Sequence, residues 1–367
     1  MQEMSGYGKY PVGIIRRELP EADFSHLPYP QAYSGSTKII RMINAALDQL
    51  KPDVEKAVAR YGPEKIGICY GSCDNGSEAS RIAHTGLFEN NAFPEDYSLC
   101  FQSAAFPVEI ISRKFGVSGP AFTIATACAS GASAIIRGAE LIRAGICGAV
   151  IAGGADIVSW VAFSGFHALE AVSDSLTNPF SKNRKGINLG EGAAFFLLAA
   201  EQSTSKAGEL PCVELLGAGE SADAFHMTAP GTDGAGPERA MKAALLDAGM
   251  ESDQVGYVNL HGTGTALNDK AEALAMKSVF KKQPPASSTK PITGDTLGAA
   301  GALEAAICWM VLTEKKGLPV HCWDGVRDEE VPFFPVEANQ TTTPVCMSNS
   351  FAFGGCNVSL ILGRNEK

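Results

Sequence analysis

The segment TACASGASA, residues 126–134, is the point from which the fold can be worked out. The residues that lead into it, FTIATAC (122–128), are apolar and β-branched, which is typical of a buried strand. Small residues follow Cys128 and open a helical pattern over 131–143. A strand that leads directly into a helix is a building unit of layered α/β proteins. We therefore expect Cys128 at a strand-to-helix turn.

The same alternation of strand and helix recurs along the whole chain. We expect strands at 65–71, 122–128, 148–154, 193–200, 212–219, 256–262, 344–350 and 357–363. Helices are expected at 38–59 with an interruption at Pro52, and at 131–143, 237–249, 269–279 and 300–314. This order predicts mostly parallel sheets covered by helices, in two similar halves. The polar segment 201–210 divides the chain into residues 1–205 and 206–367.

Composition excludes several classes of protein. The 367 residues are 45% hydrophobic and 19% charged, which fits a large core and not a disordered chain. A net charge of -10 argues against nucleic acid as a partner. There is no apolar run of about 20 residues and no signal-like start, so we expect a cytoplasmic protein without a membrane span. The ten cysteines are expected to be reduced, and neither Cys69 with Cys73 nor any other set suggests a metal or a cofactor.

Cys128 is the candidate nucleophile. The free N–H groups of a helix N-terminus can lower a thiol pKa from about 8.5 to between about 3.5 and 7.5. The small residues that follow Cys128 leave space for a substrate to approach. The alternative, that Cys128 is only a small buried hydrophobic residue, stays open from this local pattern alone.

His261 is the second candidate, within NLHGTGTALNDKAEA (259–273). A strand ends at this histidine, and sites in such sheets form where strands end. Asp269 and Glu272 begin the helix that follows. A phosphate-binding loop is excluded because no Lys-Ser/Thr pair follows the glycines. A structural histidine on a loop is the alternative.

Taken together, these segments resemble the elongating β-ketoacyl-acyl carrier protein synthases, a family of condensing enzymes. The resemblance rests on T-A-C-x-S-G at 126–131, H-G-T-x-T at 261–265, and TKPITGDTLGAAG at 289–301, which is similar to T-K-x-x-x-G-H-x-x-G-A-A-G. NSFAFGGCN (349–357) and NPFSKNRKGINLGEGAA (178–194) add two further motifs. The similarity runs from about residue 35 to the end of the chain.

The resemblance implies a thiolase-like α/β fold of five layers, α-β-α-β-α, made of two similar halves. It also implies an acyl carrier protein as partner, in its acyl and malonyl forms, and a homodimer or a heterodimer with another ketosynthase. Cys128 would carry the acyl chain as a thioester, and His261 would stabilise the charge that forms on the malonyl thioester. The remaining roles would be a buried pair of Lys290 with Glu304, an oxyanion hole from the N–H groups of Cys128 and Phe353, and a gating loop of Phe351, Ala352 and Phe353.

Asp295 is the main departure from the family pattern, because it stands where the family has a second catalytic histidine. That histidine donates a hydrogen bond to the forming enolate, and a carboxylate cannot donate. We therefore expect weak malonyl decarboxylation, with acyl transfer to Cys128 less affected. Two alternatives to a condensing enzyme of fatty acid, polyketide or aryl polyene synthesis stay open. One is a non-condensing partner similar to a chain-length factor, and the other is a Cys-His acyl-thioester hydrolase in which Asp295 orients water.

Three smaller departures have structural consequences. Ala352 replaces a glycine, so the gating loop is expected to swing less freely. Cys356 replaces a threonine and is expected to be a packing residue. The family's first strand is absent, and we expect the gap to lie in the centre of a sheet, with residues 10–19 forming a peripheral strand.

Overall fold

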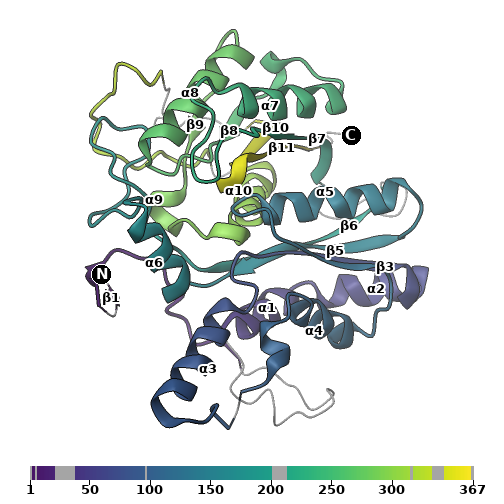
Figure 1. The fold of residues 1–367 in the computed structure, drawn as a ribbon. Coiled ribbons are helices and arrows are strands. Elements are labelled where there is room, and N and C mark those ends of the chain that lie inside the picture. The colour runs from purple at the N-terminus through teal and green to yellow at the C-terminus, as the bar shows by residue number, and fades with distance from the viewer. Residues whose placement is uncertain are drawn as a thin grey trace.

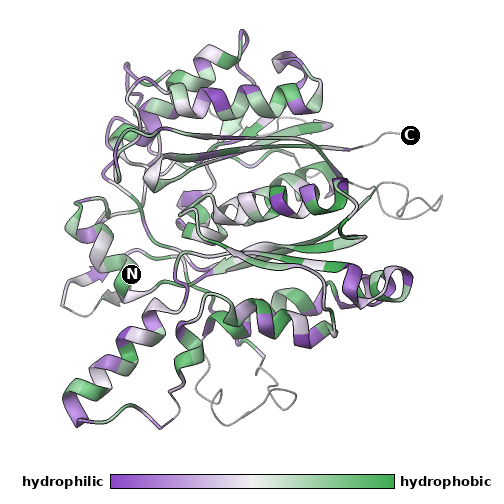
Figure 2. Ribbon diagram, turned by 45° about the vertical axis from the view of Figure 1, so that its right-hand side comes forward, coloured by the Kyte–Doolittle hydropathy of each residue, from purple (hydrophilic) through white to green (hydrophobic). Residues whose placement is uncertain are grey.

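The computed structural model describes residues 2–4, 6–20, 38–95, 97–200, 213–314, 317–332 and 343–364. Two sheets lie one above the other, with helices between them and on both outer faces (Figure 1). Figure 2 shows hydrophobic residues along both sheets, while hydrophilic residues gather on the outer helices. The five-layered α-β-α-β-α architecture expected from the family resemblance is confirmed.

The first half is built around a four-stranded sheet in the order β4-β3-β5-β6. Its strands are β3 (Ile66–Gly71), β4 (Ala121–Ile124), β5 (Ala149–Asp156) and β6 (Gly192–Ala199). Its helices are α1 (Lys38–Asp48), α2 (Lys51–Tyr61), α3 (Ser77–Asn90), α4 (Phe106–Phe115), α5 (Ser130–Arg143) and α6 (Trp160–Ala168). The interruption expected at Pro52 is confirmed, because this proline lies in the first turn of a separate helix, α2.

The second half is built around a five-stranded sheet in the order β7-β11-β10-β8-β9. Its strands are β7 (Val213–Ala222), β8 (Tyr257–Asn259), β9 (Ala286–Ser287), β10 (Val345–Phe351) and β11 (Cys356–Arg364). Its helices are α7 (Ala235–Ala248), α8 (Ala266–Val279), α9 (Lys290–Thr293) and α10 (Ala300–Glu314). The boundary expected at 201–210 lies outside the described residues.

Helices α5 and α10 form the middle layer between the two sheets (Figure 1). Their N-terminal ends pack closely, since a Cβ atom on Gly131 would lie 2.9 Å from the backbone nitrogen of Ala302. Residues Leu297–Glu314 are long and apolar enough to cross a membrane, but 61% of the segment is buried inside the protein. This segment is therefore accounted for as the core helix α10 with the turn that precedes it.

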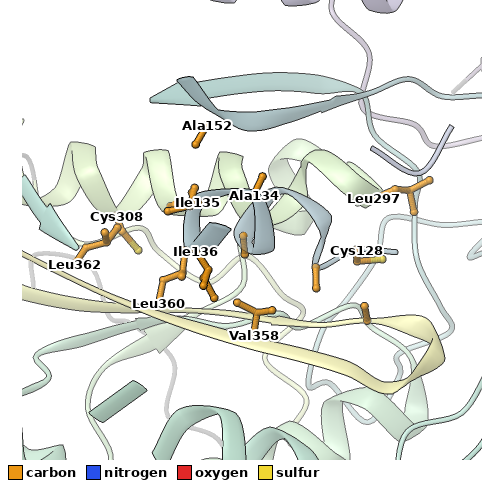
Figure 3. Close-up of a cluster of buried hydrophobic side chains, with 14 of the residues drawn as sticks. Cys128, Ala134, Ile135, Ile136, Ala152, Leu297, Cys308, Val358, Leu360 and Leu362 are labelled. Carbon is orange, nitrogen blue, oxygen red and sulfur yellow. The ribbon is translucent and has the colours of Figure 1, made fainter. Parts of the chain in front are cut away.

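The main core fills the space between the middle helices and the sheets (Figure 3). Ile135 and Ile136 of α5, Ala152 of β5, Cys308 of α10 and Leu360 of β11 belong to one buried cluster. Cys128 and Leu297 lie at one end of the same cluster. The end of the core where strands stop and the middle helices begin is thus the place where the candidate nucleophile sits.

The strand pairing confirms one expectation and corrects another. The sheets are mostly parallel as expected, with one antiparallel strand in each: β6 runs antiparallel to β5, and β11 runs antiparallel to both β10 and β7. A tight hairpin at 352–355 joins β10 to β11 and forces that pair to be antiparallel. The strand expected at 122–128 ends at Ile124, since the residues after it turn toward α5.

The N-terminal expectations are also corrected. The expected strand over 10–19 is absent, because only Tyr10 belongs to a strand and residues 11–19 form one isolated bridge, between Gly13 and Gly190. Instead, β1 (Gln2–Met4) and β2 (Gly8–Tyr10) form a small hairpin of their own. In the second half the first strand, β7, lies at the sheet edge next to the last strand, β11. Among the described residues of the first half, no strand pairs with the outer edge of β6, so the position that corresponds to β7 lies at that edge and not in the centre of the sheet.

Candidate active site

Cys128 sits in a turn that its neighbours fix firmly. Ala127 adopts a left-handed conformation with φ of 49°, which turns the chain out of the β4 direction. The Ser130 hydroxyl accepts a hydrogen bond from the Thr126 N–H at 2.9 Å and donates one to the Ala127 carbonyl at 2.6 Å. Helix α5 begins at Ser130, so Cys128 precedes its first turn as expected. The side chain is 3% exposed.

His261 follows β8, and two carboxylates hold the loop after it. Glu272 accepts the backbone N–H groups of His261 at 2.9 Å and Gly262 at 2.8 Å. Asp269 accepts those of Gly264 at 3.1 Å and Phe180 at 2.7 Å. Burial raises the pKa of Glu272 to about 7 and that of Asp269 to about 6. These two acids, singled out in the sequence, therefore shape the loop after His261 and do not line the neighbouring cavity.

Lys290 connects His261 to Glu304 in the core. Its ammonium lies 2.5 Å from Glu304 Oε1 and 3.3 Å from His261 Nδ1. Burial lowers the pKa of Lys290, but the carboxylates of Glu304 and Asp295 outweigh it, and the net pKa is raised. Because an ammonium only donates, Nδ1 of His261 is the acceptor, and the ring proton belongs on Nε2. Burial, followed by Lys290, lowers the pKa of His261 well below its ordinary value, so the ring is neutral at pH 7.

Asp295 lies in a turn between α9 and the short helix η6 (Leu297–Ala299). Its backbone is fixed by two hydrogen bonds to the first half, N–H to the Asn188 carbonyl and carbonyl to the Gly190 N–H, each 2.7 Å long. Its Oδ1 accepts the Leu297 N–H at 3.0 Å. The carboxylate is therefore held in one orientation, with 1% of the residue exposed.

One cavity of about 390 Å³ joins most of the predicted site residues. Cys128, His261 and Asp295 line it together, although they come from three separate segments. The three residues of the expected gating loop, Phe351, Ala352 and Phe353, also line it. Lys290 and Glu304 do not line the cavity but lie behind His261. Among the residues that the structure describes, no group of three or more histidines, cysteines or acids could hold a metal ion.

The surroundings of Cys128 contradict the expected lowering of its thiol pKa. Burial raises the pKa well above its ordinary value, and the charge of Asp295 raises it further. Lys290 acts in the opposite direction, but with less effect. The sequence pattern identified the helix N-terminus correctly and missed the burial that opposes it.

The gating loop is held at several points. The Phe353 ring packs edge-on against Phe166 of α6, with ring centroids 5.1 Å apart. Ala352 has φ of -94° and ψ of 157°, which is extended backbone that alanine adopts without strain. Its N–H donates to the Cys356 carbonyl at 2.8 Å. Cys356 does not line the cavity and packs partly buried against the core.

Asp156 is a structural residue of the site that sequence reasoning missed. It is fully buried at the end of β5 and accepts hydrogen bonds from Ser72 Oγ at 2.8 Å and from the N–H groups of Cys73 at 2.7 Å and Asp74 at 2.9 Å. It also accepts the Gly298 N–H at 2.7 Å, which ties down the turn that carries Asp295. Burial raises its pKa to about 7. Its position directly after an apolar strand was the available signal, the same one that pointed to His261.

Comparison with known proteins now identifies the family. Models of the N-terminal and C-terminal domains of β-ketoacyl synthase match residues 44–203 and 212–321. The 3-oxoacyl-[acyl-carrier-protein] synthase 2 of Staphylococcus aureus (strain COL) is 33% identical over 337 residues, which cover 88% of this chain and 81% of that relative. The chain belongs to the β-ketoacyl synthase family.

Other β-ketoacyl synthases support the same assignment. The 3-oxoacyl-[acyl-carrier-protein] synthase 2 of Vibrio cholerae serotype O1 is 36% identical over 318 residues, covering 82% of this chain and 76% of that protein. A solved complex of the ketosynthase ApeO with its chain length factor ApeC from Xenorhabdus doucetiae contains a chain that is 39% identical, with a TM-score of 0.89. The match covers 98% of this chain and 88% of that one. The fold is that of a ketosynthase, and the chain is an enzyme of the β-ketoacyl synthase type.

Proposed function

We propose that this ketosynthase takes an acyl chain from an acyl carrier protein onto Cys128 and condenses it only weakly with a malonyl unit. The observation that carries the proposal is the shared cavity of Cys128, His261 and Asp295. A nucleophile and a donor remain in place, and an acceptor occupies the position of the family's second donor. The nucleophile that acyl loading needs is therefore present, while decarboxylation lacks one hydrogen bond to the enolate.

The individual steps assign a role to each group. Cys128 Sγ attacks the carrier thioester, and the backbone N–H groups of Cys128 and Phe353 stabilise the oxyanion. Within the described residues, neither N–H donates to a backbone carbonyl outside its own helix or strand. His261 donates from Nε2 to the malonyl thioester oxygen as carbon dioxide leaves, while Lys290 and Glu304 keep its ring in the required tautomer. An ionised Asp295 repels both the malonyl carboxylate and the enolate.

Intact-protein mass spectrometry tests the proposal directly. Incubation with acyl-carrier protein should add one acyl mass to the enzyme, and the Cys128→Ala variant should stay unmodified. Incubation with malonyl-carrier protein should release carbon dioxide only slowly. Failure of Cys128 to be acylated, or brisk decarboxylation by the isolated chain, would refute the proposal. Release of free acid would instead support the thioester hydrolase.

A partner role in a ketosynthase heterodimer is the second candidate. The observation that favours it is the solved complex of a ketosynthase with its chain length factor, which contains a chain very similar to this one. The carboxylate at 295 favours the same reading, because a subunit that does not condense has no need of a second donor. Cys128 and His261 argue against a wholly inactive partner. Co-purification with candidate ketosynthases, followed by the mass assay with and without them, distinguishes the two roles.

A further inference from the structure

The charges around Cys128 suit a different attacking group from a malonyl unit. Four charged residues line the cavity: Glu170, Arg184, Lys185 and Asp295. Arg184 is paired with Asp328 at 2.6 Å, and Lys290 behind the cavity is paired with Glu304 at 2.5 Å. Asp295 is the buried charge of this set, whereas Glu170 and Lys185 are exposed. The charge that an attacking group meets in the inner cavity is therefore negative.

The hydrogen-bonding groups of the inner cavity also divide into one donor and one acceptor. His261 can offer only its Nε2–H, because Lys290 occupies Nδ1 at 3.3 Å. Asp295 can only accept, and among the described residues only the Leu297 N–H, on Oδ1, donates to its carboxylate. Its second oxygen, Oδ2, is thus left for a substrate. A substrate that both carries N–H groups and becomes positive would satisfy this arrangement.

Three classes of nucleophile differ in the charge that develops as they attack a thioester. A malonyl-derived carbanion brings negative charge, which Asp295 repels. A thiol brings no positive charge once its proton is lost. An amine becomes positive on nitrogen, and a fixed carboxylate in a cavity of low dielectric stabilises that charge. With aspartate in place of histidine, the cavity therefore favours an attacking atom that becomes positively charged over one that is negatively charged.

We propose that the enzyme transfers the acyl chain of Cys128 to a primary amine and so forms an amide. The neutral amine attacks the thioester carbon, a C–N bond forms, and the carbonyl electrons move to oxygen. Asp295 takes a proton from the positively charged nitrogen. The oxyanion then collapses, the C–S bond breaks, and the Cys128 sulfur leaves and recovers the proton from Asp295. The net change is thioester plus amine to amide plus thiol, with no oxidant or cofactor.

The proposal rests on acylation of Cys128, so the test separates loading from release. Acyl-Cys128 is prepared from acyl-carrier protein, or from an acyl-N-acetylcysteamine thioester if the carrier does not load it. Butylamine or N-acetylcysteamine is then added, and loss of the acyl mass and appearance of amide are followed by mass spectrometry. Amide formation faster than for the free acyl-N-acetylcysteamine thioester is the expected result.

Two variants at one position make the outcome decisive. Asp295→Asn should slow amide formation by about 10²–10³-fold, as loss of one preorganised charge-stabilising group does, and should slow release to N-acetylcysteamine far less. Asp295→His should also lose amide formation, but should gain malonyl decarboxylation, which a misfolded variant could not do. Equal amide formation by wild type and Asp295→Asn would overturn the proposal, and so would release of free acid in place of amide. If Cys128 is acylated by the small thioester but not by acyl-carrier protein, the proposed loading from a carrier protein is wrong. Amide formation from acyl-Cys128 can still be tested in that case.

Discussion

The ammonium nitrogen of Lys290 lies 3.3 Å from Nδ1 of His261, and both side chains are almost completely buried. This contact decides which proton the imidazole can use, because it leaves Nε2–H as the only group that His261 can offer to a substrate. Glu304 completes the arrangement by balancing the lysine charge. A lysine that does not line the cavity thereby determines which ring proton His261 can present to it.

Lys290→Met should destabilise the fold strongly. Removing one partner leaves the Glu304 carboxylate buried without its counter-charge, which typically costs about 3–5 kcal/mol. The matched control is Lys242→Met, which removes an exposed pair with Glu238 and should cost about 0–1 kcal/mol. Urea unfolding of both variants measures the free energies, and equal losses would contradict the buried-pair interpretation.

Asp295→His should restore the missing donor. The rate of malonyl-carrier decarboxylation should rise by about 10²–10³-fold, because a neutral imidazole can stabilise the enolate that a carboxylate repels. Radiolabelled carbon dioxide release measures this rate. Asp295→Asn is the control that removes the charge at nearly constant size and should give a smaller gain. A decarboxylation rate unchanged by the histidine would show that another feature limits the reaction.

The sequence was sufficient to predict most residues of the candidate site, but not the pKa shifts that their surroundings cause. Cys128 and His261 each follow an apolar strand, and strand ends of a layered sheet meet at one place, so their shared cavity could be expected. Asp156 gives the same signal and was missed, because its partners are the Ser72 hydroxyl and three backbone N–H groups, which no sequence motif marks. The predicted lowering of the Cys128 thiol pKa was wrong, because the burial that raises this pKa depends on residues distant in sequence.

The fold was predictable where hydrophobic periodicity is strong. Helices α5 and α10 begin within a residue of the predicted starts, since small residues and long apolar patterns mark them. Strand direction was not predictable from periodicity, so the antiparallel β6 and β11 were missed. Nor could the pattern at 10–19 show that Tyr10 would end a small hairpin and that Gly13 would form the one bridge over 11–19.

Ala352→Gly should loosen the gating loop. Alanine 352 is unstrained in its extended conformation, so glycine would add freedom without relieving strain and should cost about 0.5–1 kcal/mol of stability. Phe353 should then leave its contact with Phe166 more readily, and long acyl chains should load onto Cys128 faster. Single-turnover acylation measures the effect, and a short acetyl group, which needs less space, serves as the control. Equal acceleration for both chains would argue against a gate.

His321 should make the fold sensitive to acid. Its Nδ1 accepts the Ser288 N–H at 3.2 Å and its Nε2 donates to the Pro179 carbonyl at 3.0 Å, an arrangement that only the neutral ring can keep. Burial lowers its pKa from 6.5 to about 4. The unfolded chain binds this proton below pH 6.5 and the folded chain only near pH 4, so the stability present above pH 6.5 is lost as the pH falls between these values.

The loss at pH 5 should be about 2 kcal/mol relative to pH 7, since one unit of pKa difference corresponds to about 1.4 kcal/mol. Asp156 and Glu272, whose pKa values are raised to about 7, act with the opposite sign over the same range. The informative quantity is therefore the difference in unfolding free energy between wild type and His321→Gln at each pH. That difference should shrink as the pH falls, because glutamine keeps a neutral acceptor and cannot gain the proton. A constant difference would mean that His321 has the same pKa in the folded and unfolded chains, and that its hydrogen bonds to Ser288 and Pro179 do not hold it neutral.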